Sequence, residues 1–106
     1  MNFPKSLKSI LDTKIYLTKE RWEHIIQEHP IIEKYLKEIE KTIAIPDIII
    51  GSKYDKEILL YYKFYKSIYR GKFITVIVKH TEERSFILTA YITDKIKGGI
   101  SIWKKN

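Results

Sequence analysis

The segment from Phe86 to Thr93 has the alternating pattern of a β-strand with two different faces. One face would carry Phe86, Leu88, Ala90 and Ile92, and the other would carry Ile87, Thr89, Tyr91 and Thr93. Successive side chains of a strand point to opposite sides, so one side would be buried and the other would present a row of hydroxyl groups. We interpret Thr89 and Tyr91 as candidate donors to a phosphate group.

Two histidines and a lysine would complete a site that cleaves RNA without a metal ion. His24 and His29 lie on one predicted helix, and Lys79 lies on the strand that precedes Phe86. In such a reaction the 2′-hydroxyl of RNA attacks the adjacent phosphorus, while a base removes its proton and an acid protonates the leaving 5′-oxygen. Histidine titrates near neutral pH and can take either role. Lysine and hydroxyl groups can stabilise the charge on the phosphorane.

Each candidate also has an interpretation that requires no catalytic function. Lys79 can be a solvated residue on a sheet surface, and Thr89 favours a strand whatever its role. His29 ends a helix, where the dipole favours a histidine and a backbone carbonyl can accept a hydrogen bond from its ring N–H. His24 is either solvated or oriented by a carboxylate one turn away, and His80 is predicted to lie on the surface.

The remaining motifs argue against other chemistries. The chain has no cysteine, which excludes disulfides, thiolate metal sites and a thiol nucleophile. The three histidines lack the spacing of a zinc protease and have no carboxylate cluster beside them. Gly98-Gly99 lacks the flanking residues of a phosphate-binding loop, and no serine stands in a nucleophile elbow. We therefore expect neither a metal nor another cofactor.

The composition predicts one globular domain over residues 1–106. Hydrophobic residues make up 44% of the chain, which is enough for a single core. No apolar run reaches the roughly 18–20 residues of a membrane span, and the N-terminal residues have no apolar signal core. Together with the absence of cysteine, this predicts a cytoplasmic protein that does not enter a membrane.

The net charge of +7 is concentrated in the second part of the sequence. Residues 1–60 contain ten basic and ten acidic residues, whereas residues 61–106 contain ten basic and three acidic residues. A one-sided positive charge is typical of a protein that binds a polyanion, most often a nucleic acid. We expect a nucleic acid or another phosphate-bearing partner, with Lys63, Arg70, Lys95 and Lys97 as its phosphate contacts; the alternative is that the charge serves solubility alone.

The hydrophobic periodicity predicts helices first and strands afterwards. Short elements are expected at Pro4 to Leu11 (helix) and Lys14 to Leu17 (strand), followed by helices at Lys19 to His29, capped by Thr18, and at Ile31 to Ala44. Strands are expected at Ile48 to Ile50, Glu57 to Tyr65, Phe73 to His80, Phe86 to Thr93 and Ile100 to Trp103. We expect an α+β fold with N-terminal helices packed on one face of a four- to five-stranded antiparallel meander sheet, whose other face is open.

The same periodicity assigns side chains to the two faces of the sheet. Ile74, Val76 and Val78 are wholly aliphatic and are predicted to pack against the helices. Thr75 and Lys79 would then lie on the open face. The more amphipathic set Leu59, Tyr61, Lys63 and Tyr65 is predicted to share that open face. A β-bulge would reverse such an assignment beyond its position.

The order of these segments resembles the barnase–EndoU–colicin–RelE (BECR) nuclease superfamily, especially its small phage and mobile-element branch. The segments that carry the resemblance are Ile15 to Thr18, Arg21 to Ile25, Glu28 to Pro30, Ile45 to Asp47, Val76 to Lys79, Ile87 to Thr93 and Ile102-Trp103. They span about residues 15–103. A BECR-like fold would follow from this resemblance.

The resemblance implies a ribonuclease, often the toxin of a toxin–antitoxin pair, for which an acidic antitoxin protein would be a second partner. His24 and His29 match the helix histidines, Lys79 the basic strand residue, and Thr89 and Tyr91 the late hydroxyl positions. Our hypothesis is a metal-independent endoribonuclease in which a histidine transfers the proton and Lys79 holds the phosphate. The alternatives are a non-catalytic RNA- or protein-binding module that uses the basic sheet face, and an inactive member of a toxin–antitoxin complex.

Overall fold

The computed structural model describes residues 2–106 and builds them into one sheet with two α-helices. The elements are β1 (Lys5–Lys8), β2 (Lys14–Leu17), α1 (Lys19–Glu28), the 3₁₀ helix η1 (Pro30–Tyr35), α2 (Leu36–Ala44), β3 (Ile48–Gly51), β4 (Ile58–Tyr65), β5 (Lys72–His80), β6 (Ser85–Thr93) and β7 (Ile100–Lys104). Within the described residues, no helix has the length and apolar character that crossing a bilayer requires.

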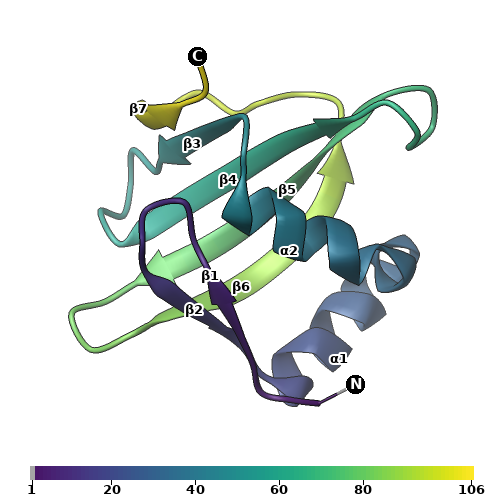
Figure 1. The fold of residues 1–106 in the computed structure, drawn as a ribbon, viewed down its shortest axis with the longest axis horizontal. Coiled ribbons are helices and arrows are strands. Elements are labelled where there is room, and N and C mark those ends of the chain that lie inside the picture. Colours follow the sequence, from purple (N-terminus) through teal and green to yellow (C-terminus); the bar gives the residue numbers. More distant parts are fainter. Residues whose placement is uncertain (1) are drawn as a thin grey trace.

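The sheet has seven strands in the order β1-β2-β6-β5-β4-β3-β7. All neighbours are antiparallel except β2 and β6, which pair in parallel. Both α-helices cover the same face of the sheet (Figure 1). The prediction of a four- to five-stranded antiparallel meander behind N-terminal helices is therefore wrong, because β1 and β2 extend the sheet beyond β6 at one edge and β7 pairs with β3 at the other.

The segment from Pro4 to Leu11, predicted to be helical, instead forms β1 and the turn that leads into β2. Its Leu7 is buried and pairs with Ile15 of β2. The Ser9 hydroxyl lies 2.6 Å from the Tyr61 hydroxyl of β4, and the backbone N–H of Ile10 donates to the carbonyl of Ile43. The contacts of Ser9 and Ile10 link residues more than 30 positions apart, so the local pattern of the segment contains no sign of them.

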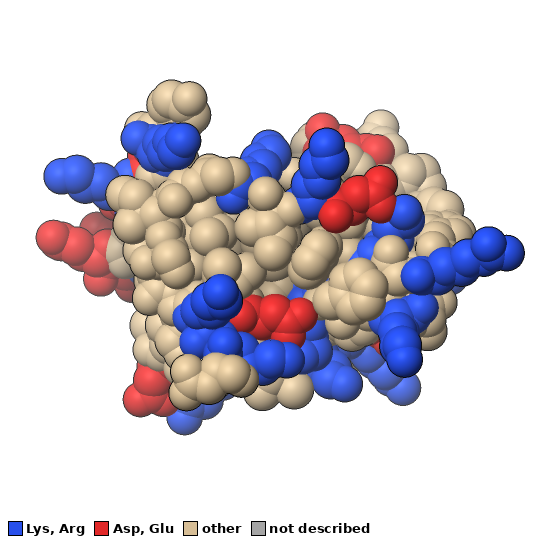
Figure 2. Space-filling view, turned by 90° about the horizontal axis from the view of Figure 1, so that it is seen from above, with Lys and Arg blue, Asp and Glu red and all other residues tan. Residues whose placement is uncertain are grey.

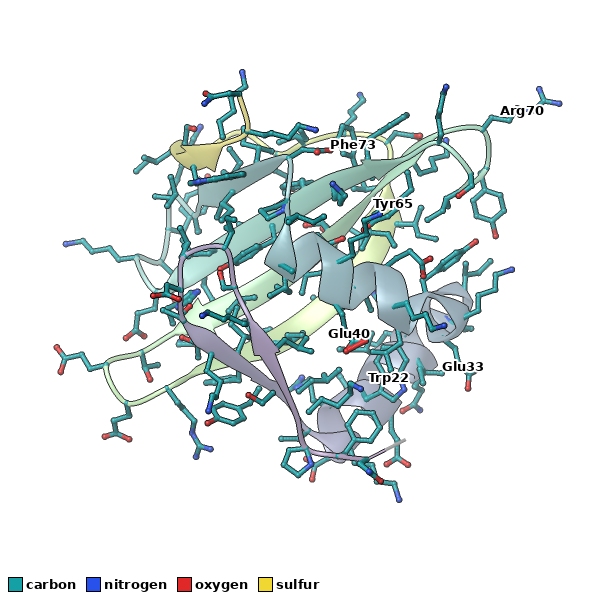
Figure 3. The ribbon with its side chains drawn as sticks, in the orientation of Figure 1. Trp22, Glu33, Glu40, Tyr65, Arg70 and Phe73 are labelled. Atoms are coloured by element: carbon teal, nitrogen blue, oxygen red, sulfur yellow. The ribbon has the colours of Figure 1, made fainter. Side chains whose placement is uncertain are left out.

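The first α-helix confirms the capping pattern read from the sequence. The Thr18 side chain accepts a hydrogen bond from the backbone N–H of Arg21, and α1 ends before Pro30. Trp22 points from α1 into the core that α1 and α2 cover together (Figure 3). Beyond Pro30 the chain forms a 3₁₀ helix, so α2 begins at Leu36 rather than near Ile31.

The helix-facing side of the sheet contains the main core. Ile74, Val76 and Val78 lie in it, as predicted. Tyr61, which was predicted to lie on the open face, is buried in this core, and Leu59 and Tyr65 of the same predicted set pack against it. The two tyrosines are accommodated because their hydroxyls find partners there. Tyr65 donates to the carbonyl of Glu38 in α2, and burial raises its pKa to about 12. An amphipathic tyrosine can therefore occupy a buried position at little cost, which the alternating pattern could not reveal.

A bulge in β6 changes which of its side chains face the helices. The register with β5 shifts between Ile77 and Val78, so that Leu88 has no partner in the ladder. Ile87 is buried in the main core, whereas Phe86 pairs with Lys79 on the opposite side of the sheet. The predicted grouping of Phe86 with Leu88, Ala90 and Ile92 is therefore wrong on the N-terminal side of the bulge.

The face that was predicted to be open is covered by the connection from β6 to β7. This segment, residues 94–99, passes over β5, β4 and β3 to reach the far edge (Figure 1). The backbone N–H of Lys97 donates to the hydroxyl of Tyr62, which with Ile50 and Leu60 forms a second, smaller core. At Gly99 a Cβ would lie 2.5 Å from the carbonyl oxygen of Gly51, so only glycine fits there.

Asp47 joins the end of α2 to two strands. Its carboxylate accepts a 2.7 Å hydrogen bond from the backbone N–H of Phe64, and lies 3.1 Å from the Lys105 ammonium and 3.6 Å from that of Lys63. Burial by itself would raise the pKa of Asp47. The hydrogen bonds from Phe64 and Lys105 and the charges of the two lysines outweigh it and hold the pKa below the ordinary 3.8.

We expect Asp47→Asn to lower the free energy of unfolding by about 2 kcal/mol at neutral pH, because a charged acceptor is lost. Since the folded pKa is lowered, the stabilisation is present above pH 3.8 and is lost as the pH falls through the folded value. The deficit of the variant should therefore vanish in acid, as measured by urea unfolding across this range.

Asp12→Asn is the matched control, since Asp12 forms an exposed pair with Lys8 at 3.0 Å and its positive φ suits asparagine. We expect a change within about 0.5 kcal/mol. Equal effects of the two substitutions would contradict the role given to Asp47.

Candidate functional site

His29 and Tyr91 are the two predicted site residues that the structure brings into contact. Their ring centroids lie 5.2 Å apart with the planes tilted by 31°. His29 terminates α1, where its backbone N–H donates to the carbonyl of Ile25 at 2.8 Å. Tyr91 pairs with Thr75 of β5, and no strand of the described chain pairs with the other side of β6 at that position. The ring of Tyr91 thus meets His29 at a free sheet edge.

These two rings line a cavity of about 400 Å³ together with Tyr69 and the first residues of η1. The η1 residues in the lining are Pro30, Ile31 and Ile32, and Glu28 and Ile92 complete it. The size is within the range of small-ligand sites, about 300–1,000 Å³. The surface is apolar and aromatic apart from Glu28 and His29, which suits a flat, partly apolar group such as a nucleobase.

Tyr69 was not predicted as a site residue, and its backbone is strained. It has a φ of 45°, and the next two residues, Arg70 and Gly71, also have positive φ values of 65° and 119°. A non-glycine residue in this region costs about 1–3 kcal/mol and is often found at binding sites. The turn between β4 and β5 thereby places an exposed tyrosine ring in the cavity wall. The glycine of the turn was the only signal of this in the sequence.

His24 lies outside the cavity although it is on the same helix as His29. Five residues separate them, which corresponds to about 140° around a helix axis. The imidazole of His24 lies 3.4 Å from the Glu28 carboxylate, and both side chains are 52% exposed. The structure thus gives His24 a carboxylate partner on the surface, one of the two interpretations left open by the sequence.

The structure does not place the side chain of Lys79 near that of His29. Its ammonium lies 3.6 Å from Asp55 and 3.7 Å from Glu57, both in the connection between β3 and β4. Thr75, the strand partner of Tyr91, is four residues away from Lys79, about 13 Å along β5. Lys79 therefore neutralises two carboxylates at the opposite end of the strand and does not face the cavity.

Thr89 lies on the same face of β6 as Tyr91, but its hydroxyl is enclosed. The Oγ1 atoms of both Thr89 and Thr75 are buried and have no hydrogen-bond partner among the described residues. Thr93 is different, because its hydroxyl donates to the carbonyl of Lys95 at 3.4 Å. A buried hydroxyl cannot reach a phosphate in solvent, so the geometry favours Tyr91 over Thr89 as the site residue of this strand.

The four predicted phosphate contacts do not form one patch. Lys63 donates to the carbonyl of Ile45 and pairs with Asp47. Arg70 extends from the tip of the β4–β5 turn, away from the body of the molecule (Figure 3). Lys95 and Lys97 belong to the covering connection between β6 and β7. Viewed from above, basic side chains lie around the margin of the molecule with acidic ones among them (Figure 2).

His80, which was predicted to lie on the surface, is half-buried on the helix-facing side of β5. Its Nδ1 lies 2.6 Å from the hydroxyl of Ser85, the residue opposite it in β6. Nε2 is buried and has no partner in the part of the chain that the structure describes. Burial lowers the pKa of His80, so protonating it opposes folding as the pH falls below the ordinary value of 6.5.

Residues 2–106 contain no group of three or more acidic, histidine or cysteine side chains placed to hold a metal ion. Comparison of the chain with protein-family models, curated proteins and solved structures finds no match. The resemblance to the BECR superfamily therefore stays a prediction.

We expect Thr89→Val to raise the free energy of unfolding by about 1 kcal/mol, because it removes a buried hydroxyl without a partner and keeps the side-chain shape. Thr93→Val is the control on the same strand and face, and should lower stability by about 1 kcal/mol because it loses the bond to Lys95. Urea unfolding measures both. A destabilised Thr89→Val would show that the Thr89 hydroxyl makes a favourable polar contact.

Proposed function

We propose that this protein cleaves single-stranded RNA without a metal ion, at the cavity formed by His29, Tyr69 and Tyr91. The observation that carries the proposal is the contact between the His29 and Tyr91 rings at the mouth of an aromatic cavity. Within the described chain, no hydrogen bond engages the ring nitrogens of His29, which leaves them available to a substrate.

The reaction would proceed by attack of the RNA 2′-oxygen on the adjacent phosphorus. A bond forms between the 2′-oxygen and phosphorus, and the bond from phosphorus to the 5′-oxygen breaks. Two protons move: one leaves the 2′-hydroxyl and one is added to the leaving 5′-oxygen. His29 carries out one of these transfers and a solvent water molecule the other. The Tyr91 hydroxyl donates to a phosphate oxygen as charge develops on it. The products are a 2′,3′-cyclic phosphate and a free 5′-hydroxyl.

The rings of the cavity would hold the bases beside the reacting phosphate. Exposed tyrosines stack on unpaired bases, and such stacking contributes about 1–3 kcal/mol per base. Tyr69 is 54% exposed and lines the same cavity as Tyr91. Arg70 follows Tyr69 in the turn and supplies a positive charge near the strand. An unpaired RNA strand therefore suits this cavity better than a duplex, whose bases are stacked on one another.

The alternative is a module that binds RNA through these rings and does not cleave it. The observation that favours it is the separation of Lys79 and His24 from the cavity, which leaves His29 as its one histidine. The prediction of a toxin with an acidic antitoxin stays a prediction; among residues 2–106, the basic side chains without an acidic partner that such a protein could bind include Lys66, Arg70 and Lys104.

Purified protein incubated with labelled single-stranded RNA in EDTA should release fragments with 2′,3′-cyclic phosphate ends. We expect His29→Ala to slow cleavage by about 100-fold or more, and Tyr91→Phe by about tenfold or more. His24→Ala is the matched control on the same helix, and we expect a change of at most about threefold, because its exposed side chain lies outside the cavity and any charge there would be screened by solvent.

RNA binding without cleavage would favour the alternative. Equal rates for His29→Ala and the unmodified protein would contradict the proposed site. Circular dichroism of each variant establishes that the fold is retained.

A further inference from the structure

A second cavity, of about 270 Å³, lies at the opposite end of α1 from His29. It is lined by Tyr16 of β2, Thr18, Glu20 and Arg21 at the start of α1, Arg84 in the β5–β6 turn, and Phe86 of β6. The chain has three arginines, and two of them line this one cavity. None of these residues was a predicted site residue.

Both arginines are free to bind an anion. In the described part of the chain, neither Arg21 nor Arg84 forms an ion pair, and Glu20 is the only carboxylate in the lining. The backbone N–H of Arg21 is already satisfied by the Thr18 hydroxyl at 3.1 Å, so the anion would be bound by the guanidinium groups rather than by the helix end. The planar fork of arginine matches phosphate oxygens.

The turn that carries Arg84 is held in place by hydrogen bonds. The Thr81 hydroxyl donates to the carbonyl of Arg84 at 2.7 Å, and the backbone N–H of Arg84 donates to the Thr81 hydroxyl oxygen at 3.1 Å. The N–H of Thr81 also donates to the Arg84 carbonyl at 2.9 Å. A fixed backbone reduces the conformational entropy that binding would cost.

An aromatic wall stands beside the arginines. Tyr16 and Phe86 are register partners in the parallel pair of β2 and β6, so their rings lie side by side on one face of the sheet. That face is opposite the main core, because Ile15, Leu17 and Ile87 point into the core. Both rings are half-buried and therefore partly accessible. Phosphate-binding arginines next to accessible aromatic rings are the combination that recognises a nucleotide.

We propose that this second cavity binds one nucleotide of a single-stranded RNA, with the phosphate between Arg21 and Arg84 and the base against Tyr16 and Phe86. The proposal takes RNA as the ligand from the proposed function. Eight residues separate Arg21 and His29, about 12 Å along the helix, and β6 contributes to both cavities. One strand following α1 and β6 would thus occupy both cavities, a few nucleotides apart.

The test measures mononucleotide binding separately from cleavage. Isotope-labelled protein is titrated with adenosine 5′-monophosphate, and in parallel arms with inorganic phosphate and with adenosine, while the backbone amide signals of Thr18 and Arg84 are followed. We expect the monophosphate to shift these signals at the lowest concentration. Arg21→Ala and Arg84→Ala should each weaken its binding by about tenfold or more, because each removes a charged donor.

Lys56→Ala is the matched control, since it removes one positive charge from an exposed position outside the cavity lining. We expect it to weaken binding by at most about twofold. An equal loss in all three variants would overturn the proposal in favour of unspecific charge attraction. Equal binding of inorganic phosphate would overturn the role of the aromatic wall.

Cleavage gives an independent readout. With Arg21→Ala, a long single-stranded RNA should lose its advantage over a dinucleotide substrate, so the ratio of the two cleavage rates should fall, whereas Lys56→Ala should leave that ratio unchanged. If the protein binds the mononucleotide but cleaves no RNA, the ribonuclease proposal fails and the nucleotide site stands. If it cleaves RNA and the arginine variants behave like the unmodified protein with both substrates, the nucleotide site fails alone.

Discussion

The pairing of β5 with β6, and the bulge that interrupts it, is the constraint on which both cavities depend. Without the shift opposite Ile77 and Val78, Phe86 and Tyr91 would lie on opposite faces of β6, because their positions in the strand differ by five, an odd number. The extra residue, Leu88, brings them to the same face. It also lets Ile87 enter the core, so the strand remains anchored while its two aromatic residues reach opposite ends of α1.

Ion pairs formed in the folded protein determine which basic residues keep an unpaired positive charge. The basic excess of residues 61–106 is real, but four of these lysines pair with carboxylates: Lys63 and Lys105 with Asp47, Lys72 with Asp94, and Lys79 with Asp55 and Glu57. Three of those four pair with acidic residues from the neutral first part of the chain. The arginines that line the second cavity keep their charge available. The location of positive electrostatic potential is therefore determined by the ion pairs of the fold, and a count of charged residues along the sequence does not predict it.

Local signals in the sequence predicted local structure well. The Thr18 cap, the end of α1 before Pro30 and all six predicted strands agree with the structure to within one residue at each end. What could not be predicted depends on distant partners. Pro4 to Leu11 became a strand through β2 and β4, and Tyr61 was buried through Ser9. Of the candidate site residues, His29 and Tyr91 meet, whereas Lys79 is held elsewhere by Asp55 and Glu57, carboxylates whose position no pattern in the sequence indicates.

The parallel pairing of β2 with β6 also determines at which point of synthesis the sheet can be completed. Ile15 pairs with Ser85, seventy residues later in the chain, and β7 must still cross the sheet before β3 has its second neighbour. Contacts of such long separation form slowly, since the intervening chain must first be ordered. During synthesis α1 emerges early but has no β6 beside it, so neither cavity exists until β6 has left the ribosome. Any activity of these cavities is thus delayed until residues 85–93 have emerged and paired with β5.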